Sequence, residues 1–285
     1  MIAQTDILTK SLLVDLRTFQ VRDGRIVDHD DGCCARLASK SIATGMAEVL
    51  VGIDGEDDFG GAVSIPIYRG GEIVSTVVMA IAPKSAGVGV FEIWEPVEPY
   101  EEVRLRGGYF ASLERFSNVS SYVRFEKGNG LPGQVWSLGK GIIHDNLPEH
   151  PGFLRAAGAS AGLLQTAIGV PVLSENLMSA VVLISSAATP IARGYQVWLA
   201  DEDGFVLDAA AYQAVVEEDR FAIGTKISAE TPLIALARDC GGAVISGADE
   251  VTEMSRSGAG ANLLGGLAIP FYSGEKMQSI TALLF

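Results

Sequence analysis

Few residues of this chain have types and spacings that could support catalysis. His144 ends a short apolar stretch and is followed directly by Asp145, and His150 stands six positions later. A carboxylate beside a histidine can orient it as a general base. However, no serine or cysteine occupies a nucleophile elbow or a helix start. The two histidines match no tight metal-ligand pattern, so a weak metal site is less favoured than a loop cap or a solvated turn. We expect no catalytic residues and no metal.

The three cysteines, Cys33, Cys34 and Cys240, are too few for a disulfide framework. The vicinal Cys33-Cys34 pair could form a redox or soft-metal site. No histidine or second cysteine pair stands at ligand spacing, which favours two ordinary buried thiols. His29 lies in the acidic turn 28–31 and is expected to be solvated. These residues suggest no cofactor.

Composition excludes several classes of function. The 285 residues carry a formal net charge of −14, and 48% of them are hydrophobic. Such a charge repels phosphate backbones and anionic membrane surfaces, so neither nucleic acid nor membrane is an expected partner. The N-terminus has no secretory pattern, and no apolar run approaches the roughly 20 residues that span a bilayer. We expect a cytoplasmic protein with ample material for packed cores.

A glycine-rich turn organises the middle of the chain. Val123 and Phe125 alternate with polar neighbours, as in a half-buried strand. Gly128, Gly130 and Gly133 then stop that strand, and residues 131–138 are predicted to form one short helical or extended turn. A phosphate cradle is the alternative, but no Lys-Ser/Thr follows and no dinucleotide fingerprint is present. Backbone angles that only Gly or Asn adopt at low cost explain the turn better.

The succession around this turn resembles the GAF family of small-molecule sensor domains. The matching pieces are the Gly-Leu-Pro-Gly-x-Val-Trp turn at 130–136, the Ile-Ile-His-Asp strand end at 142–145, the Ile-Gly-Val-Pro-Val strand at 168–172 and the strand after it. The match is good over about residues 88–186. The resemblance implies an antiparallel sheet with a ligand pocket between the sheet and inserted segments.

Specific activities of GAF subfamilies are not indicated. The bilin-binding members hold their chromophore through a cysteine beside a histidine, and the corresponding region, 152–162, has no cysteine. The cyclic-nucleotide signature cannot be assembled in order. The free methionine sulfoxide reductase members need cysteines near the pocket, and Cys240 stands alone in the last third of the chain.

One hairpin pattern occurs three times. Each copy has an apolar strand with a central proline, a polar turn and a second β-rich strand; the prolines are Pro66, Pro171 and Pro270. The repeat predicts three modules, at 1–84, 85–188 and 189–285. The fold class is α/β (α+β): repeated GAF-like modules, each a central antiparallel sheet with short helices or lid loops, without long linker helices. The first module is predicted to be shortened and structural.

Inserts and links differ from the usual tandem arrangement. The second copy has inserts at 111–123 and 152–164, and the third at 209–221 and 251–264, each long enough for a helix or a lid. The links contain Pro83 and Pro190 and are too short for long helices. Only Thr5–Leu16 is amphipathic. Since each sheet needs a second layer, we expect the three sheets to cover one another's backs, within one chain or across a homodimer.

The resemblance leads to a candidate ligand site in the second module. Phe125 and Trp136 would form apolar walls, and His144, Asp145 and Arg155 would supply polar groups. The alternatives are plain core packing for the two aromatic residues and a solvated helix charge for Arg155. The favoured function is a non-enzymatic signalling sensor that binds a small molecule or a protein partner. A homodimer is expected. The alternative is a structural interaction scaffold with degenerate pockets.

Overall fold

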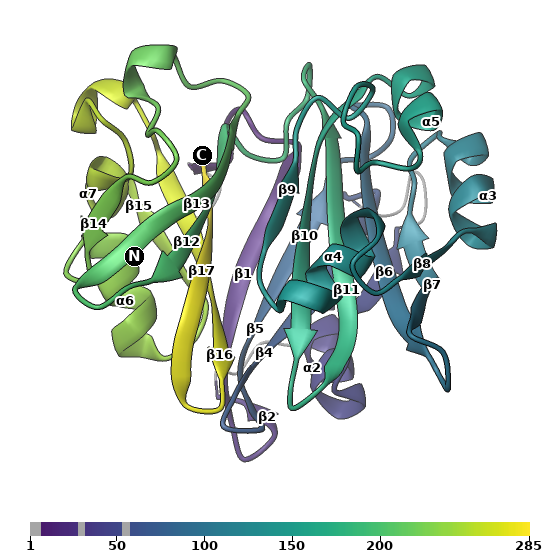
Figure 1. Cartoon of the computed structure of the whole chain (residues 1–285), viewed down its shortest axis with the longest axis horizontal. Helices are drawn as coiled ribbons and strands as arrows, with labels where there is room; N and C mark the ends of the chain where they lie inside the picture. The colour runs from purple at the N-terminus through teal and green to yellow at the C-terminus, as the bar shows by residue number, and fades with distance from the viewer. Residues whose placement is uncertain (1–6, 28–31, 53–57) are drawn as a thin grey trace.

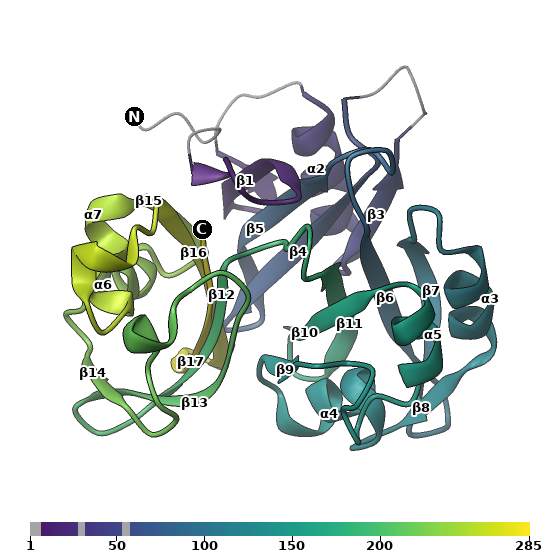
Figure 2. The same cartoon turned by 90° about the horizontal axis from the view of Figure 1, so that it is seen from above.

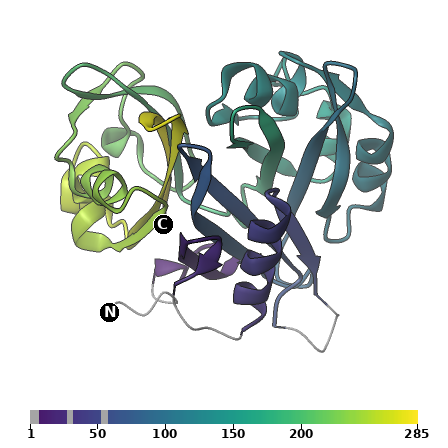
Figure 3. The same cartoon turned by 90° about the horizontal axis from the view of Figure 1, so that it is seen from below.

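The computed structural model describes residues 7–27, 32–52 and 58–285, and within this part the chain forms three curled antiparallel sheets. His29 and its acidic turn lie outside the described residues. Figure 1 shows the sheets with short helices beside them, and Figures 2 and 3 show three bodies around a common centre. Each sheet with its helices is called the first, second or third module below. The predicted module boundaries themselves stay a prediction.

Each sheet is built from neighbouring antiparallel strands. The first, in spatial order, contains β2 (Arg25–Ile26), β1 (Leu13–Arg22), β5 (Glu72–Ile81), β4 (Gly61–Arg69) and β3 (Glu48–Val51). The second contains β8 (Arg124–Glu126), β7 (Glu102–Tyr109), β6 (Gly89–Val97), β11 (Leu177–Ser186), β10 (Leu164–Leu173) and β9 (Ile142–His144). The third contains β14 (Lys226–Ser228), β13 (Gly204–Tyr212), β12 (Gly194–Ala200), β17 (Lys276–Leu284), β16 (Gly265–Ser273) and β15 (Val244–Gly247).

The threefold repeat is confirmed by the strand register. Pro66 pairs with Thr76, Pro171 with Ala180 and Pro270 with Ile280, each on the second strand of its hairpin. In every copy the ladder shifts between the first and second residues after the proline. The outer strands β3, β9 and β15 each start opposite the residue two before the proline. The missing proline N–H therefore falls beyond the end of that ladder, where it costs no hydrogen bond.

The inner faces of the three sheets share one hydrophobic core, as expected from the short links. Side chains from all three modules belong to a single buried cluster, which includes Val63, Ile65 and Met79, then Ile168, Val170 and Leu183, then Leu267, Ile269 and Leu283. The arrangement is cyclic, because β3 contacts β6 and β7, β9 contacts β12 and β13, and β15 contacts β1. The sheets thus cover one another's backs within one chain.

Short helices cover the outer faces. They are α2 (Cys33–Thr44), α3 (Glu114–Tyr122), α4 (Gly130–Leu138), α5 (Ala156–Ala161), α6 (Pro232–Cys240), α7 (Ala248–Val251) and the 3-10 turns η1 (Glu217–Asp219), η2 (Thr252–Met254) and η3 (Gly258–Ala261). The insert at 111–123 holds α3 and that at 152–164 holds α5, whereas 209–221 is mainly the end of β13 followed by η1.

The first module, which was predicted to be shortened, is covered by the helix α2. It packs on β4 and β5 and forms a small core with Phe19, Ala62 and Val78. Its buried side chains are at positions 34, 35, 37, 38 and 41, and those at 34, 37, 38 and 41 follow helical spacing. This spacing is visible in the sequence, but the residues are small and only weakly apolar.

The segment Thr5–Leu16 leads into the first sheet. Ile7, Leu8, Leu12 and Leu13 are buried in the central core, and Leu13 already begins β1. Residues 5 and 6 lie outside the described part of the chain. The links 82–88 and 187–193 are fully described and contain turns but no helix. In the part of the chain that the structure covers, no helix has both the length and the apolar character needed to cross a bilayer.

The glycine turn has the backbone angles that its sequence predicts. Gly128 and Gly130 have φ values of 90° and 61°, in the region that favours glycine. The segment after them is helical, as α4. Glycine is required at position 133 for a different reason. A Cβ built there would overlap the backbone carbonyl oxygen of Glu126, so the helix approaches the end of β8 too closely for any side chain.

Replacing Gly133 with alanine should therefore destabilise the protein by about 2 kcal/mol or more, because backbone must move to admit the methyl group. The matched control is Gly107→Ala, whose Cβ would lie at an ordinary 3.5 Å from Val49 Cγ1. That change should be close to neutral. Urea unfolding of both variants measures the difference, and equal midpoints would contradict the packing explanation.

Candidate functional site

The interior of the second module contains a buried ion pair. Arg155 is 4% exposed and Glu92 is fully buried. The Arg155 guanidinium donates to both carboxylate oxygens of Glu92, with Nη2 to Oε2 at 2.8 Å, and Nη1 lies 2.6 Å from Ser120 Oγ. The interpretation of Arg155 as a solvated helix charge is therefore wrong. The local cause is α5, which begins directly after Arg155 and turns the side chain inward.

Aromatic rings enclose this ion pair. The Arg155 guanidinium carbon lies 4.6 to 5.8 Å from the ring centres of Phe116, Phe153, Trp94 and Phe125. Trp94 also donates its indole N–H to Glu92 Oε2 at 3.1 Å, and Phe125 packs edge-on against Trp94. Cation–π contacts stabilise a guanidinium that has lost its water. Phe125 and Arg155 thus contact the same buried cluster.

The third module repeats half of this arrangement. Gln196 and Trp198 occupy the register positions of Glu92 and Trp94, because Ile280 and Ala180 both stand opposite their module's proline. Trp198 donates to Gln196 Oε1 at 3.0 Å. The amide nitrogen of Gln196 then donates to Met254 O at 3.0 Å, so a neutral side chain satisfies the same tryptophan without an arginine.

The remaining predicted site residues lie apart from the ion pair. Trp136, on α4, is half-buried and has Lys127 Nζ at 5.2 Å from its ring. His144 is 2% exposed; its Nε2 lies 3.0 Å from Gln134 Oε1, and its ring stacks on His150 at 3.9 Å. Asp145 accepts from Thr166 Oγ1 at 2.6 Å and from Gln213 Nε2, which belongs to the third module, at 3.2 Å.

Burial sets the protonation of the two histidines. It lowers the pKa of His144 to about 4, with His150 adding a smaller effect in the same direction. Burial also lowers the pKa of His150, although Asp145 opposes this. Both rings are therefore neutral near pH 7. His150 Nδ1 accepts the N–H of Gly152 at 3.2 Å.

The cysteines do not form a reactive site. Cys34 is buried, and burial together with the neighbouring Asp15 raises the pKa of its thiol. A thiol held protonated is a poor nucleophile. Cys240 is exposed on the third module, and its sulfur accepts from Gln20 Nε2 of the first at 3.0 Å. Among the described residues, no group of three or more potential ligand side chains is placed to hold a metal.

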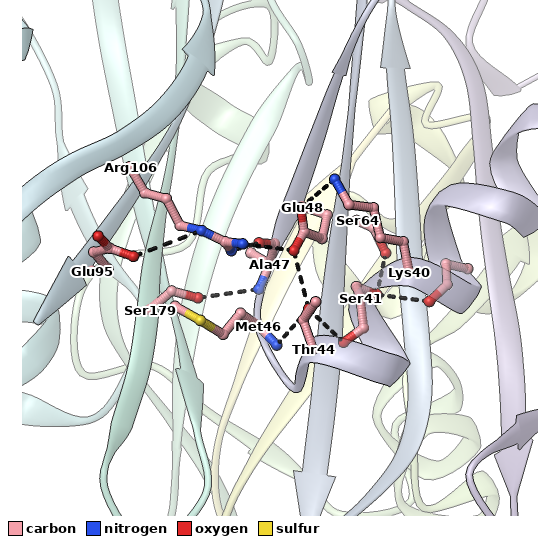
Figure 4. A network of polar contacts seen from close by, with 11 residues as sticks. Lys40, Ser41, Thr44, Met46, Ala47, Glu48, Ser64, Glu95, Arg106 and Ser179 are labelled. Carbon is pink, nitrogen blue, oxygen red and sulfur yellow. Dashed lines mark hydrogen bonds and ion pairs between the residues drawn. The ribbon is translucent and has the colours of Figure 1, made fainter.

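A polar network joins the first module to the second (Figure 4). Glu48 is 4% exposed and receives Arg106 Nη2 at 2.8 Å, Lys40 Nζ at 2.9 Å and Thr44 Oγ1 at 3.1 Å. Arg106 also donates to the backbone oxygen of Ala47 at 2.9 Å. Burial raises the pKa of Glu48, but the hydrogen bonds outweigh it and hold this pKa below its usual value.

The same backbone contact recurs between other modules. Ala47, two residues after the left-handed glycine that ends α2, donates its N–H to Ser179 Oγ at 3.2 Å. Ala243, two residues after the glycine that ends α6, donates to Ser75 Oγ at 2.9 Å. The equivalent serine of the third module, Ser279, is buried, and its hydroxyl has no hydrogen-bond partner among the described residues. The contact between the second and third modules therefore lacks this hydrogen bond.

The signs of the paired charges are reversed between two module contacts: that of the first with the second module and that of the second with the third. Arg106 and Asp208 occupy the same position, the unpaired residue of the shift in β7 and in β13. Arg106 meets the carboxylate of Glu48 in the first module, whereas Asp208 meets Lys140 Nζ of the second at 2.6 Å. Exchanging the modules would put like charges together. The two ion pairs thus favour this order of modules over alternative pairings.

Replacing Arg106 with methionine should cost about 2 kcal/mol, because Glu48 stays buried with only Lys40 and Thr44 as partners. Glu48→Ile alone should cost less, since the other modules carry Ile142 and Val244 at the equivalent position. The double variant should be more stable than the sum of the two single effects predicts. Urea unfolding of all four proteins gives the coupling, and strict additivity would contradict a direct interaction.

Comparisons with known proteins are limited to structure. No protein-family model and no curated protein matches the chain. The GAF domain of the A. aeolicus nlh2 protein, in an inactive state, is 19% identical over 35% of this chain and 59% of its own, with a TM-score of 0.29. The free methionine-R-sulfoxide reductase of Neisseria meningitidis, in complex with its substrate, is 19% identical over 35% of this chain and 53% of its own, with a TM-score of 0.28.

A third solved structure matches a larger share of its own length. NreA from Staphylococcus aureus, mutated in its nitrate-binding site, is 14% identical over 38% of this chain and 82% of its own, with a TM-score of 0.30. The chain thus spans little more than half the length of the first two structures. The resemblance to GAF domains is confirmed as a likeness of fold over about 35% of the chain.

Proposed function

We propose that this chain is a non-enzymatic interaction scaffold, in which three GAF-like modules form one body and present their outer surfaces to a protein partner. The observation that carries the proposal is the ion pair between Arg155 and Glu92. It occupies the interior of the second module, where the family resemblance had suggested a ligand site.

The contacts of Arg155 favour a structural role over ligand binding. Its guanidinium is used by Glu92 and Ser120 and is surrounded by rings, so a ligand would have to break a desolvated ion pair to reach it. Phe125 is buried against the same group. In the third module, Gln196 closes the corresponding position with hydrogen bonds to the protein itself.

The chemistry of the described residues gives no support to catalysis. His144 is a neutral ring hydrogen-bonded to Gln134, and the Cys34 thiol is held protonated. A general base must reach the proton that it removes, and a nucleophile must be activated. The charged side chains between modules instead form ion pairs with each other, Arg106 with Glu48 and Lys140 with Asp208.

A ligand screen on two proteins tests the proposal. Wild type and the Glu92→Gln/Arg155→Met variant are compared by thermal shift against metabolites and nucleotides. If the interior of the second module is closed, every compound that stabilises the wild type stabilises the variant equally. A compound that raises the melting temperature of the wild type by several degrees, and loses this effect in the variant, would establish a live pocket and overturn the scaffold.

A further inference from the structure

A separate cavity lies where the N-terminal segment meets the third module. Its volume is about 330 Å³, and its lining is formed by Ile7, Lys10, Ser11, Arg193, Asn262, Leu264 and Phe285. This volume is at the lower end of the range for small-molecule sites, roughly 300–1,000 Å³. None of the predicted site residues, Arg155 included, is among its lining residues.

The charge of the lining is opposite to that of the molecule. Lys10 and Arg193 both line the cavity, and none of the described lining residues is Asp or Glu, although the chain carries a net charge of −14. Neither cation forms an ion pair with a described residue. Two unpaired cations beside a concave surface attract an anion.

Arg193 is held in place by backbone oxygens. Its Nε and Nη2 donate to Ala214 O at 3.3 and 3.0 Å, Nη2 also approaches Ala261 O at 3.4 Å, and Nη1 donates to Asn262 O. These contacts use four of the five N–H groups of an arginine and fix the guanidinium plane. The remaining N–H of Nη1 is thus pre-oriented, which lowers the entropy cost of binding.

Three of the other five described lining residues are apolar. Ile7 and Phe285 are 3% and 2% exposed, and Leu264 forms part of the rim. Phe285 is fixed through its backbone, since its N–H donates to Gly265 O at 2.9 Å and its oxygen accepts the N–H of Leu264 at 2.7 Å. The hydroxyl of Ser11 is engaged by Ile191 O and by the N–H of Leu13. Hydrogen bonds to the protein thus fix the backbone of Phe285 and the hydroxyl of Ser11.

From this combination we propose that the cavity binds a small amphipathic monoanion, a carboxylate on an aromatic ring or a short branched chain. The carboxylate would lie between Lys10 and Arg193, and the apolar part would contact Ile7 and Phe285. Such a ligand would connect residues 7–11 to the third module, in addition to the hydrogen bond between Leu12 N and Pro190 O. This site is independent of the proposed scaffold function.

Benzoate, benzamide and benzamidine form a matched set of probes, because they share one shape and differ in charge. With the full chain, we expect benzoate to bind with a Kd on the order of 1 mM, and the neutral and cationic analogues at least tenfold more weakly. Lys10→Glu should weaken benzoate at least tenfold. Lys276→Glu, at the exposed first residue of β17, is the control and should leave its affinity unchanged.

Titration calorimetry gives the affinities, and hydrogen exchange locates the site. Protection by benzoate should be confined to residues 7–12 and 262–265. Equal binding of benzoate and benzamide, no binding up to about 20 mM, or full binding by Lys10→Glu would each overturn the proposal. Binding that persists in Glu92→Gln/Arg155→Met is expected here, so this result does not depend on the scaffold proposal.

Discussion

Arg155→Met should destabilise the protein by about 3–5 kcal/mol, because the fully buried carboxylate of Glu92 would lose its counterion. Trp94 and Ser120 would still donate to that carboxylate, but neither carries a charge. Urea unfolding at pH 7 measures the loss. The control is Arg124→Met, which removes an exposed pair with Glu102 at 3.6 Å and should cost less than about 1 kcal/mol.

The double variant Glu92→Gln/Arg155→Met should recover most of this stability. Glutamine at 92 can accept the indole N–H of Trp94, as Gln196 accepts that of Trp198 in the third module. Methionine fills the space of the arginine chain between the rings. We expect a free energy of unfolding within about 1.5 kcal/mol of the wild type or above it. A double variant as unstable as Arg155→Met would mean that the ion pair itself stabilises the fold.

Acidification should destabilise the protein through His144. Its pKa is about 4 in the folded chain and ordinarily 6.5, so the unfolded chain binds more protons between these values. The stabilisation is complete above about pH 7 and is lost as the pH falls from 6.5 to about 4. The shift corresponds to about 3 kcal/mol. Unfolding free energies measured from pH 7.5 to 4 should show this loss.

Comparison with His144→Gln isolates this contribution from the carboxylates that titrate in the same range. The stability of the variant should fall less than that of the wild type over this range, by about 3 kcal/mol. His150→Gln is the matched control, because His150 is only partly buried and its pKa is shifted less clearly. Parallel pH curves for wild type and His144→Gln would show that the buried ring does not control acid stability.

The sheets could be predicted from the sequence because their signals are local. Alternating apolar residues, a proline at one register position and polar turns recur in each copy, and each gives the same pairing. The packing of the three sheets against one another could be predicted because each sheet needs a second layer and the links are too short to form long helices. The helix α2 was missed because its inward positions carry Cys34, Ala38 and Ser41, which give a weak apolar pattern.

The interior of the second module could not be predicted in the same way. Arg155 and its partner Glu92 are separated by 63 positions, and no local pattern pairs them. One signal is present in the sequence, where Glu92 and Gln196 each precede a tryptophan by two residues. A polar residue on the same strand face as a buried tryptophan indicates a hydrogen bond to the indole.

The shared core of the three sheets also determines when this protein can fold. The first sheet is synthesised long before the third, and the inner side chains of β4 and β5 can meet their partners on β16 and β17 only after residues 265–284 have been synthesised. Until then the nascent chain exposes hydrophobic surface of the kind that chaperones recognise. Deleting one module would expose the apolar inner sheet faces of the other two. The shortened protein should therefore aggregate instead of folding as a stable two-module protein.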